Sequence, residues 1–447
     1  MSVTHHRDPS SQIAQSFETI IGSEKVYHWE QLDSTIQHQI TAALRLDTQI
    51  DCVVYPQTPE ELSEVVACAY QNRWQMLPCG AGSKLHWGGL ADGIRVVVST
   101  ARMNRLIEHA AGDLTVTAEA GIRFADLQQT LAQSNQFLAI DPAYPDSATL
   151  GGIVATADTG ALRQRYGSIR DMLIGISLVR ADGDRVKAGG RVVKNVAGYD
   201  LMKLFTGSYG TLGIIGQVTF RVYPIPDVSQ TVVLTGNSEA IAQATAALLG
   251  SALRPTQADL LSASIVRQLE LGTGTGLVTR IQNLEISVQK QVDRLVSMAQ
   301  RLGLQSHLRS ADEEASLWKQ LREPIESSPT PSSITCKIGV VPSKAVSTLD
   351  ALLAELPSSA WGIIHAASGL GILHIGDRPI EIQTLLKLRA QCEAHGGFLT
   401  VQGAPVSLKQ QLDVWGYSGN AMSLMTGIKQ QFDSQHLLSP GRFVGGI

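Results

Sequence analysis

The sequence has little cysteine, and its cysteines are not grouped. Five occur in 447 residues, none of them in a CxxC pair, and they stand singly at Cys52, Cys68, Cys79, Cys336 and Cys392. An odd, scattered set supports neither a disulfide framework nor an iron–sulfur cluster. We therefore expect a cytoplasmic protein, because thiols stay reduced in that compartment.

Long apolar runs and an excess of basic residues are also missing. No window approaches the apolar length that crosses a bilayer, and the polar N-terminus does not resemble a secretory signal. Lys and Arg total 36 against 40 Asp and Glu, which argues against nucleic acid as the main partner. With 44% hydrophobic and 17% charged residues, the chain is typical of a globular protein of two or three domains.

Glycine, in contrast, is dense between residues 141 and 226. Gly151-Gly152 precede a run of small residues, and further glycines recur every third position among apolar residues, at Gly207, Gly210, Gly213 and Gly216. Glycine lets backbone approach a neighbour closely, and the apolar residues between argue against a flexible linker. The pattern indicates either a tightly turned β-rich domain or a backbone-lined slot for a large flat cofactor.

A second glycine loop, Gly80–Lys84, follows a predicted strand–helix–strand unit. The strands are expected at 52–55 and 75–79, and the helix is expected to start at Pro59 with Thr58 as its N-cap. Consecutive N–H groups in such a loop form an anion-binding nest. The loop lacks the spacing of a P-loop and of GxGxxG, which disfavours the common nucleotide folds, and a plain tight turn stays an alternative.

The order of predicted elements indicates an α+β protein. Residues 1–45 are expected to be an N-terminal helical segment. Residues 46–226 are strand-rich, with strands at 94–99, 114–120 and 214–222, a turn at 104–107, and a hairpin at 173–188 that turns at Asp182-Gly183. Residues 227–410 alternate strands and helices, as in a cap domain. Residues 411–447 are expected to pack back on the strand-rich domain.

Four motifs in this order resemble a known family. They are GAGSKLHWGG (80–89), DPAYPDSATLGGIVAT (141–156), KNVAGYDLMKLFTGSYGTLGII (194–215) and the terminal FD…SPGR (432–442). Together they resemble the PCMH-type FAD-binding domain of the vanillyl-alcohol oxidase family. Within that family, the first and third motifs are similar to the FAD-binding E subunits of bacterial glycolate oxidases. The resemblance implies a two-subdomain FAD-binding domain plus a smaller α+β cap.

The resemblance also implies non-covalent FAD. Members with a covalent flavin use a histidine in the first loop, but His86 lies one residue beyond the matching place and is expected to be an exposed loop histidine. Backbone groups and small side chains would hold FAD at Pro78, Gly80, Ala81, Gly82, Ser83, Lys84, Pro142, Thr149, Gly151, Gly152, Ala155, Thr156, Gly210, Gly213, Ile214, Ile215 and Arg442.

The predicted cap matches its relatives only in part. In related D-2-hydroxyacid dehydrogenases an Arg-Glu after a Trp holds the substrate carboxylate, as Arg322-Glu323 after Trp318 would here, and a later lysine, here Lys337, assists. The planar fork of arginine donates two parallel hydrogen bonds to a carboxylate. The alternative for Arg322 is a surface ion pair with Glu326.

The same relatives carry a metal element, H-x-G-D-G-N-x-H, and a later Glu-His-Gly. Here the first element runs from His365 to His374 without its Asp and Asn, and the second is replaced at 400–403. A metal site needs several converging ligands. We therefore predict no catalytic metal and no well-placed general base for the hydroxyl proton.

The resulting hypothesis is an FAD-binding subunit of a glycolate oxidase or dehydrogenase complex. A sister FAD-linked subunit would oxidise glycolate or D-lactate, an iron–sulfur subunit would take the electrons, and any membrane contact would come through these partners. One alternative is a self-sufficient FAD-dependent D-2-hydroxyacid dehydrogenase that uses Arg322, Lys337 and His374. Another is a non-catalytic interaction subunit.

Overall fold

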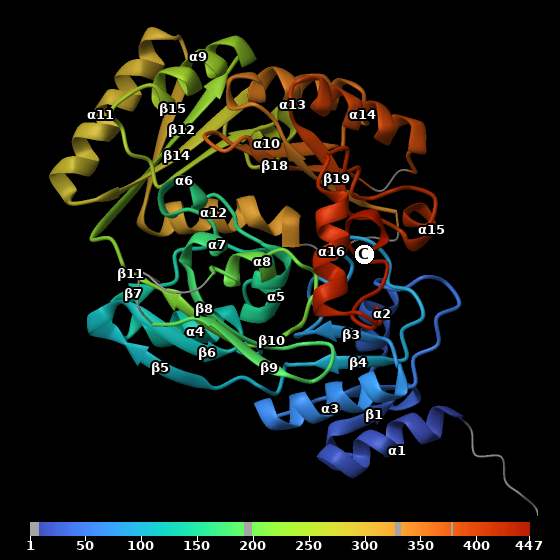
Figure 1. Cartoon of the computed structure of the whole chain (residues 1–447). Coiled ribbons are helices and arrows are strands. Elements are labelled where there is room, and N and C mark those ends of the chain that lie inside the picture. Colours follow the sequence, from blue (N-terminus) through green and yellow to red (C-terminus); the bar gives the residue numbers. More distant parts are fainter. Residues whose placement is uncertain (1–8, 192–198, 327–331, 377–378) are drawn as a thin grey trace, which may run out of the picture.

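The computed structural model describes residues 9–191, 199–326, 332–376 and 379–447 (Figure 1). Two small sheets of four and five strands lie below in this view, and a large sheet with its helices lies above them. A two-stranded pair of β7 (Gln136–Phe137) and β11 (Tyr223–Pro224) accompanies the small sheets. We call the part with the two small sheets the N-terminal part (residues 9–226) and the part with the large sheet the cap (residues 227–410).

The first sheet of the N-terminal part has the order β1-β2-β4-β3, formed by Val26–His28, Cys52–Val54, Val96–Ser99 and Met76–Cys79. β2, β4 and β3 run parallel, and α3 (Pro59–Asn72) connects β2 to β3. Helix α3 begins as predicted, since Thr58 Oγ1 accepts a hydrogen bond from the Glu61 N–H at 3.1 Å.

The segment before residue 46 is not purely helical. It contains α1 (Pro9–Ile21) and α2 (Ser34–Thr41), but β1 lies between them and pairs antiparallel with β2. The strand is only three residues long and forms through pairing with a distant partner, so no local periodicity in the sequence indicates it.

The second sheet is antiparallel with the order β5-β6-β10-β8-β9, formed by Leu106–Ala110, Thr115–Glu119, Ile214–Arg221, Leu173–Val179 and Arg185–Gly189. The predicted hairpin is confirmed, with Gly183 at φ +90° in its turn. The predicted turn at 104–107 is wrong, because Leu106 starts the edge strand β5, whose largely unburied side chains show no apolar alternation.

Short helices connect these strands. α4 and α5 lie in the segment between β6 and β8, and α8 precedes β10; they comprise Phe124–Ala132, Leu150–Thr156 and Met202–Phe205. β10 has a register irregularity between Ile215 and Gln217, and Gly216 O there accepts from the Ala120 N–H at 2.9 Å. The start of β10 also contacts α5, the helix that follows Thr149, and Gly213 and Ile214 line a common cavity with that helix.

The cap is built on one sheet that, among the described residues, has eight antiparallel strands in the order β15-β12-β14-β13-β17-β18-β16-β19. Its strands are Gln305–Ser310, Val228–Gly236, Thr275–Asn283, Gln257–Leu261, Trp361–His365, Leu370–Ile375, Ile334–Gly339 and Phe398–Gly403. The chain forms two successive βαββαβ units, which join where β13 pairs with β17.

Helices cover the two faces of the large sheet unequally. Its outer face packs against α9 (Ser238–Leu249), α11 (Glu285–Arg301), α13 (Ala345–Ala354) and α14 (Ile382–Ala394). The inner face packs against α10 (Ala263–Gln268) and α12 (Ala311–Glu326), and Ala161 of the N-terminal part joins this second cluster. The inner face is therefore the one that meets the N-terminal part.

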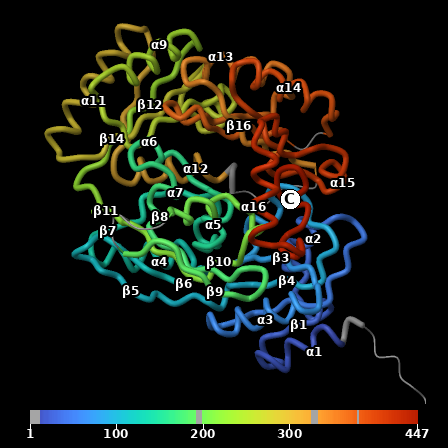
Figure 2. Tube along the Cα trace, in the orientation of Figure 1, coloured from blue at the N-terminus to red at the C-terminus, as the bar shows by residue number. Residues whose placement is uncertain are grey.

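After the cap the chain returns to the first sheet. It passes α15 (Val406–Lys409) and α16 (Met422–Phe432), and the Met76 N–H of β3 then donates to Leu437 O at 2.7 Å. Figure 2 shows this red C-terminal segment beside the blue strands. The last residues of the chain thus belong to the wall around β3.

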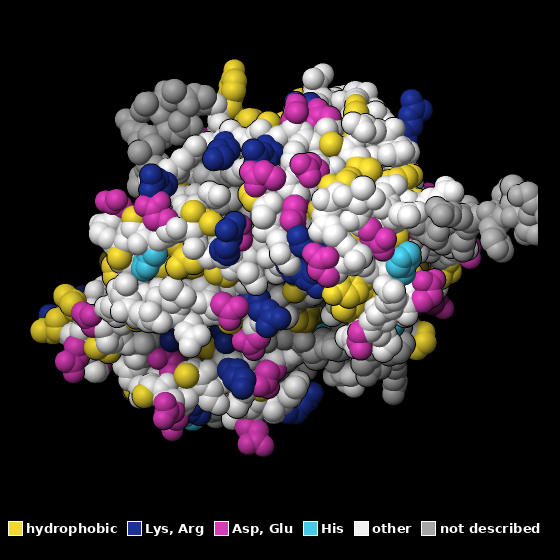
Figure 3. All heavy atoms as spheres, turned by 90° about the horizontal axis from the view of Figure 1, so that it is seen from below, with side chains coloured by type: hydrophobic (Ala, Val, Ile, Leu, Met, Phe, Trp, Pro, Cys, Tyr) yellow, Lys and Arg dark blue, Asp and Glu magenta, His cyan; other side chains and the backbone are white. Residues whose placement is uncertain are grey.

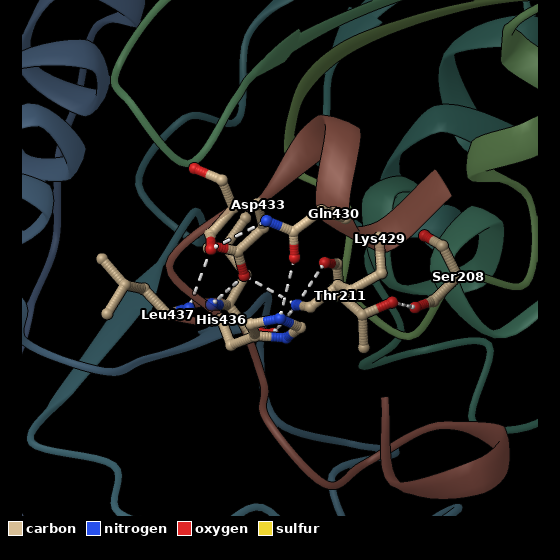
Figure 4. A network of polar contacts seen from close by, with 9 residues as sticks. Ser208, Thr211, Lys429, Gln430, Asp433, His436 and Leu437 are labelled. Atoms are coloured by element: carbon tan, nitrogen blue, oxygen red, sulfur yellow. Dashed lines mark hydrogen bonds and ion pairs between the residues drawn. The ribbon is translucent and has the colours of Figure 1, made fainter. Parts of the chain in front are cut away.

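A buried ion pair fixes the return (Figure 4). Lys429 Nζ donates to Asp433 Oδ2 at 2.6 Å and to the carbonyls of Thr211 and Leu438, each at 2.8 Å. Asp433 also accepts the N–H groups of Leu437 and Leu438. The pair joins α16, the loop before β10 and the C-terminal segment around Leu438.

We predict that Lys429→Met lowers the free energy of unfolding by about 3 kcal/mol, because it leaves a buried carboxylate without its cation. Urea unfolding followed by circular dichroism measures this. The control is Lys387→Met, which breaks the exposed pair with Glu355 and should cost less than about 1 kcal/mol. Equal effects of the two changes would contradict the role given to Lys429.

Candidate functional site

A cavity of about 730 Å³ lies where β3, the loop after it, α5 and the start of β10 meet. We call it the slot. It is lined by every residue predicted to bind FAD except Pro142. Five further residues line the slot without having been predicted from the sequence, Cys79, Leu85, Thr100, Ser208 and Tyr209.

The loop Gly80–Lys84 offers hydrogen-bond donors to the slot. The five consecutive N–H groups of this loop donate no hydrogen bond to any acceptor in the described part of the chain. Unpaired backbone donors that line a cavity are suited to an anionic ligand such as a diphosphate.

Glycines make the walls of the slot close and flat. A Cβ on Gly80 would lie 2.0 Å from Thr149 Oγ1, and one on Gly151 would lie 2.8 Å from the Ala120 Cβ. Gly210 has φ +73°, in the region that favours glycine. Gly151 and Gly152 lie within helix α5, whose N-cap is Thr149. The glycine pattern therefore forms a backbone-lined slot, the sharper of the two interpretations that the sequence allowed.

Buried cations surround the loop. Lys84 is buried and pairs with Asp158 at 2.8 Å. Lys409 Nζ donates to the carbonyls of His86 and Gly88, and Arg442 donates to those of Leu85 and Trp87. Burial lowers the pKa of Lys409 to about 7 and that of Arg442 to about 10. Of these groups Lys84 and Arg442 line the slot, and the Arg442 guanidinium has no carboxylate among its hydrogen-bond partners named above, so its charge suits the same anionic group as the N–H donors.

His86 is not an exposed loop residue, which corrects the expectation from the sequence. Its ring is half-buried beside Trp87 and Tyr144, with ring centroids 6.3 and 6.0 Å away. Burial and the neighbouring Lys409 lower the pKa of His86 to about 3, so its imidazole is neutral.

A second cavity adjoins the slot, between the N-terminal part and the inner face of the cap. Thr156 lines both, and the Lys84–Asp158 ion pair joins a residue of the slot to a residue of the second cavity. Pro142, predicted for FAD, lines this second cavity instead. A bound group that fills the slot would therefore border the second cavity.

The second cavity brings together groups from distant parts of the chain. Arg322 of α12 and Lys337 of β16 both line it, as does Arg163 of α6 (Arg163–Tyr166). Burial lowers the pKa of Lys337. The side chain of Glu326, the alternative partner of Arg322, lies outside the described residues.

Acidic and imidazole groups face these cations. His365 Nδ1 lies 2.7 Å from Asp259 Oδ1, and Gln257 Nε2 donates to Asp141 Oδ2 at 3.1 Å. Burial acts to lower the pKa of His365, but the Asp259 carboxylate outweighs it, so the pKa is raised. Burial also raises the pKa of Asp141 to about 6. The sequence indicated no role for Asp141, Gln257 or Asp259, and His365 was considered there only as the first residue of an incomplete metal element.

His374, the base suggested from the sequence, does not line the second cavity. It stacks on Trp361 with ring centroids 5.0 Å apart, and its Nδ1 lies 3.3 Å from Thr335 Oγ1. Trp318 lines the cavity, and its indole N–H donates to Thr231 Oγ1 of the sheet at 2.9 Å. Among the described residues no group of three or more His, Cys, Asp or Glu side chains could hold a metal ion.

Comparison with known proteins identifies the domain that carries the slot. Residues 50–189 match the family described as FAD binding domain. These residues are an FAD-binding domain. FAD is thus the cofactor of this chain, and its diphosphate fits the unpaired donors of Gly80–Lys84.

Relatives extend over the rest of the chain. Glycolate oxidase subunit GlcD of Bacillus subtilis is 22% identical over 96% of this chain and 94% of its own length. A D-lactate dehydrogenase of Anaerostipes hadrus is 24% identical over 99% of both. Glycolate oxidase subunit GlcE of Escherichia coli is 33% identical over 38% of this chain and 48% of its own length. The chain is an FAD-dependent oxidoreductase.

Solved structures confirm the predicted PCMH-type fold class. p-Cresol methylhydroxylase covers 97% of this chain with a TM-score of 0.74 at 16% identity. Alkyldihydroxyacetonephosphate synthase covers 98% with a TM-score of 0.72 at 14% identity. At such identities the likeness concerns the fold alone.

We predict that Gly152→Leu weakens FAD binding at least about tenfold while the protein still folds. A Cβ on Gly152 meets only Thr149 Oγ1 at 3.2 Å, so the larger side chain would extend into the slot that this residue lines. Titration of flavin-free protein with FAD, followed by flavin fluorescence, measures the change.

The matched control is Gly112→Leu. A Cβ on this exposed glycine meets nothing within 4 Å, and Gly112 lies outside the slot. Unchanged FAD affinity in Gly152→Leu, or an equal loss in both variants, would show that Gly152 does not face the flavin.

Proposed function

We propose that the chain is the FAD-binding subunit of a glycolate-oxidase-type complex and supports the oxidation of a small 2-hydroxyacid, glycolate or D-lactate, to the 2-oxoacid. The observation that carries this proposal is the contact of two cavities. The slot for FAD shares Thr156 with a second cavity that contains Arg322 and Lys337. An arginine there can hold a carboxylate next to the slot that would hold FAD.

The relatives support a proposal for the identity of the subunit. The E-type resemblance rests on the motifs at 80–89 and 194–215, and the match to GlcE at 33% identity supports it. The longer match to GlcD supports a subunit of the same enzyme class. We propose the E-type role, with a sister FAD-linked subunit in the complex.

We further propose that an iron–sulfur subunit takes the electrons. Each of the five cysteines of this chain is a free thiol, and Cys52, Cys336 and Cys392 are buried. Burial raises the pKa of Cys336 to about 12, so its thiol stays protonated. Scattered, protonated thiols are unsuited to a cluster, and this supports our proposal that a partner subunit carries it.

The partners would also decide where the complex resides. No helix of the described chain is long and apolar enough to cross a membrane. On the face seen in Figure 3, basic and acidic side chains are mixed. We propose a cytoplasmic subunit whose membrane association, where it occurs, comes through the other subunits.

The second cavity also favours a second candidate, a self-sufficient D-2-hydroxyacid dehydrogenase. It contains Arg322 and Lys337 in one chain, together with acid–base groups that border the FAD slot. Such a chain would oxidise its substrate without a sister subunit.

The test is the absorbance of purified holoprotein after anaerobic addition of glycolate and then D-lactate. We expect flavin bands that bleach when the partner subunits are present. Bleaching of the isolated chain would select the self-sufficient dehydrogenase. Flavin bands that persist with every 2-hydroxyacid, even in the whole complex, would overturn the proposal that this chain supports the oxidation of such a substrate.

Arg322 supplies a second prediction. We expect Arg322→Met to raise the 2-hydroxyacid concentration for half-maximal flavin reduction about tenfold or more, because a charge-assisted hydrogen bond to the carboxylate is lost. The control is Arg301→Met, an exposed residue at the end of α11 and outside both cavities. An unchanged concentration dependence in Arg322→Met would assign the carboxylate to another cation.

A further inference from the structure

We propose that His365, oriented by Asp259, accepts the hydroxyl proton of the 2-hydroxyacid in the second cavity. This inference rests on the proposed function and assigns a catalytic residue and a positioning residue for it. It also replaces two sequence-based expectations, namely that His374 is the candidate base and that no base is well placed.

The geometry of the pair is that of an oriented imidazole. Nδ1 of His365, at the end of β17, lies 2.7 Å from Asp259 Oδ1 on the neighbouring strand β13. A carboxylate at Nδ1 fixes the tautomer with the proton on Nδ1, which leaves Nε2 as an acceptor. Among the described residues, no hydrogen bond is recorded for Nε2, and the imidazole side chain retains 18% exposure in the cavity.

The other candidate acceptors in the cavity are already engaged. Asp141 accepts the Leu162 N–H at 3.1 Å and the Gln257 amide. Asp158 pairs with Lys84 and accepts the Ala143 N–H at 2.9 Å. Both carboxylates hold the cavity wall in place, whereas His365 presents a ring nitrogen to the interior.

The charges around the imidazole suit a proton acceptor. The carboxylates of Asp259 and Asp141 favour the protonated imidazole, while Arg163 opposes it. The remaining charged residues that line the cavity are Asp158, Arg322 and Lys337. The carboxylates of Asp259 and Asp141 raise the pKa of the imidazole, so that a neutral His365 can take up a proton and hold it after the reaction.

The hydroxyl O–H bond breaks and its proton passes to His365 Nε2, and the electron pair of that bond forms the C=O bond. The hydride that leaves Cα carries the two electrons, for which bound FAD would supply the acceptor. The substrate becomes the 2-oxoacid, and Asp259 stabilises the imidazolium through Nδ1.

The experiment measures anaerobic flavin reduction by glycolate and by D-lactate as a function of pH, with the holoprotein in its complex. The wild-type rate should rise with pH as His365 becomes neutral, with its midpoint above the ordinary histidine value of about 6.5. His365→Gln should reduce the rate about 100-fold or more and remove this dependence. Asp259→Asn should move the midpoint to lower pH, since Asp259 raises the pKa of the imidazole. His374→Gln should change neither the rate of flavin reduction nor its dependence on pH.

A second readout does not depend on turnover. Oxalate binding to flavin-free protein, measured by calorimetry in buffers of different ionisation enthalpy, should take up a proton near the midpoint pH. The bound anion favours the imidazolium, so this uptake should disappear in His365→Gln. FAD titration of each variant checks that the fold is retained.

The outcomes separate this inference from the proposed function. A wild-type flavin that neither substrate reduces overturns both. Normal reduction with an unchanged pH dependence and proton uptake in His365→Gln overturns the role of His365 alone. A rate that EDTA abolishes and Zn²⁺ or Mn²⁺ restores would also overturn it, because a metal would then activate the hydroxyl group.

Discussion

Both cavities depend on one set of hydrogen bonds, in which the buried side chains of Lys409 and Arg442 hold the loop of residues 85–88. The carbonyls from Leu85 to Gly88 point at Lys409 and Arg442, which come from the far end of the chain. The same loop continues backward into Gly80–Lys84, which lines the FAD slot, and Trp87 lines the second cavity. Without the C-terminal return, the buried side chains of Lys409 and Arg442 and the carbonyls of residues 85–88 would lose their hydrogen-bond partners. Unpaired polar groups in a dry interior cost free energy of folding.

The Lys84–Asp158 ion pair carries this constraint from the cofactor to the substrate side. Lys84 belongs to the loop that offers N–H donors to the diphosphate, and Asp158 belongs to the wall of the second cavity. The side chains are 4% and 13% exposed, so solvent screens the pair little. A shift of the loop when FAD binds would therefore act on the segment that holds Asp158.

The sequence predicted the FAD slot far better than the second cavity, and the reason is physical. Close contacts at Gly80 and Gly151 and the positive φ of Gly210 require glycine at these positions. The resulting glycine pattern is local in the sequence and can be recognised without a structure. The pair of His365 and Asp259 leaves no such pattern, because 106 residues separate its members and only the pairing of β13 with β17 brings them together. The edge strand β5 was missed for a similar reason, as its exposure removes the alternation that marks a strand.

The charge of the second cavity explains why a small anionic substrate suits it. Asp158 is compensated by Lys84, and Asp259 by the histidine whose protonation it favours. Burial raises the pKa of Asp141 to about 6, which weakens its negative charge in mildly acidic conditions. Arg163, Arg322 and Lys337 then leave the cavity with an excess of positive charge. In a low-dielectric space such an excess favours a carboxylate over a neutral alcohol of the same size.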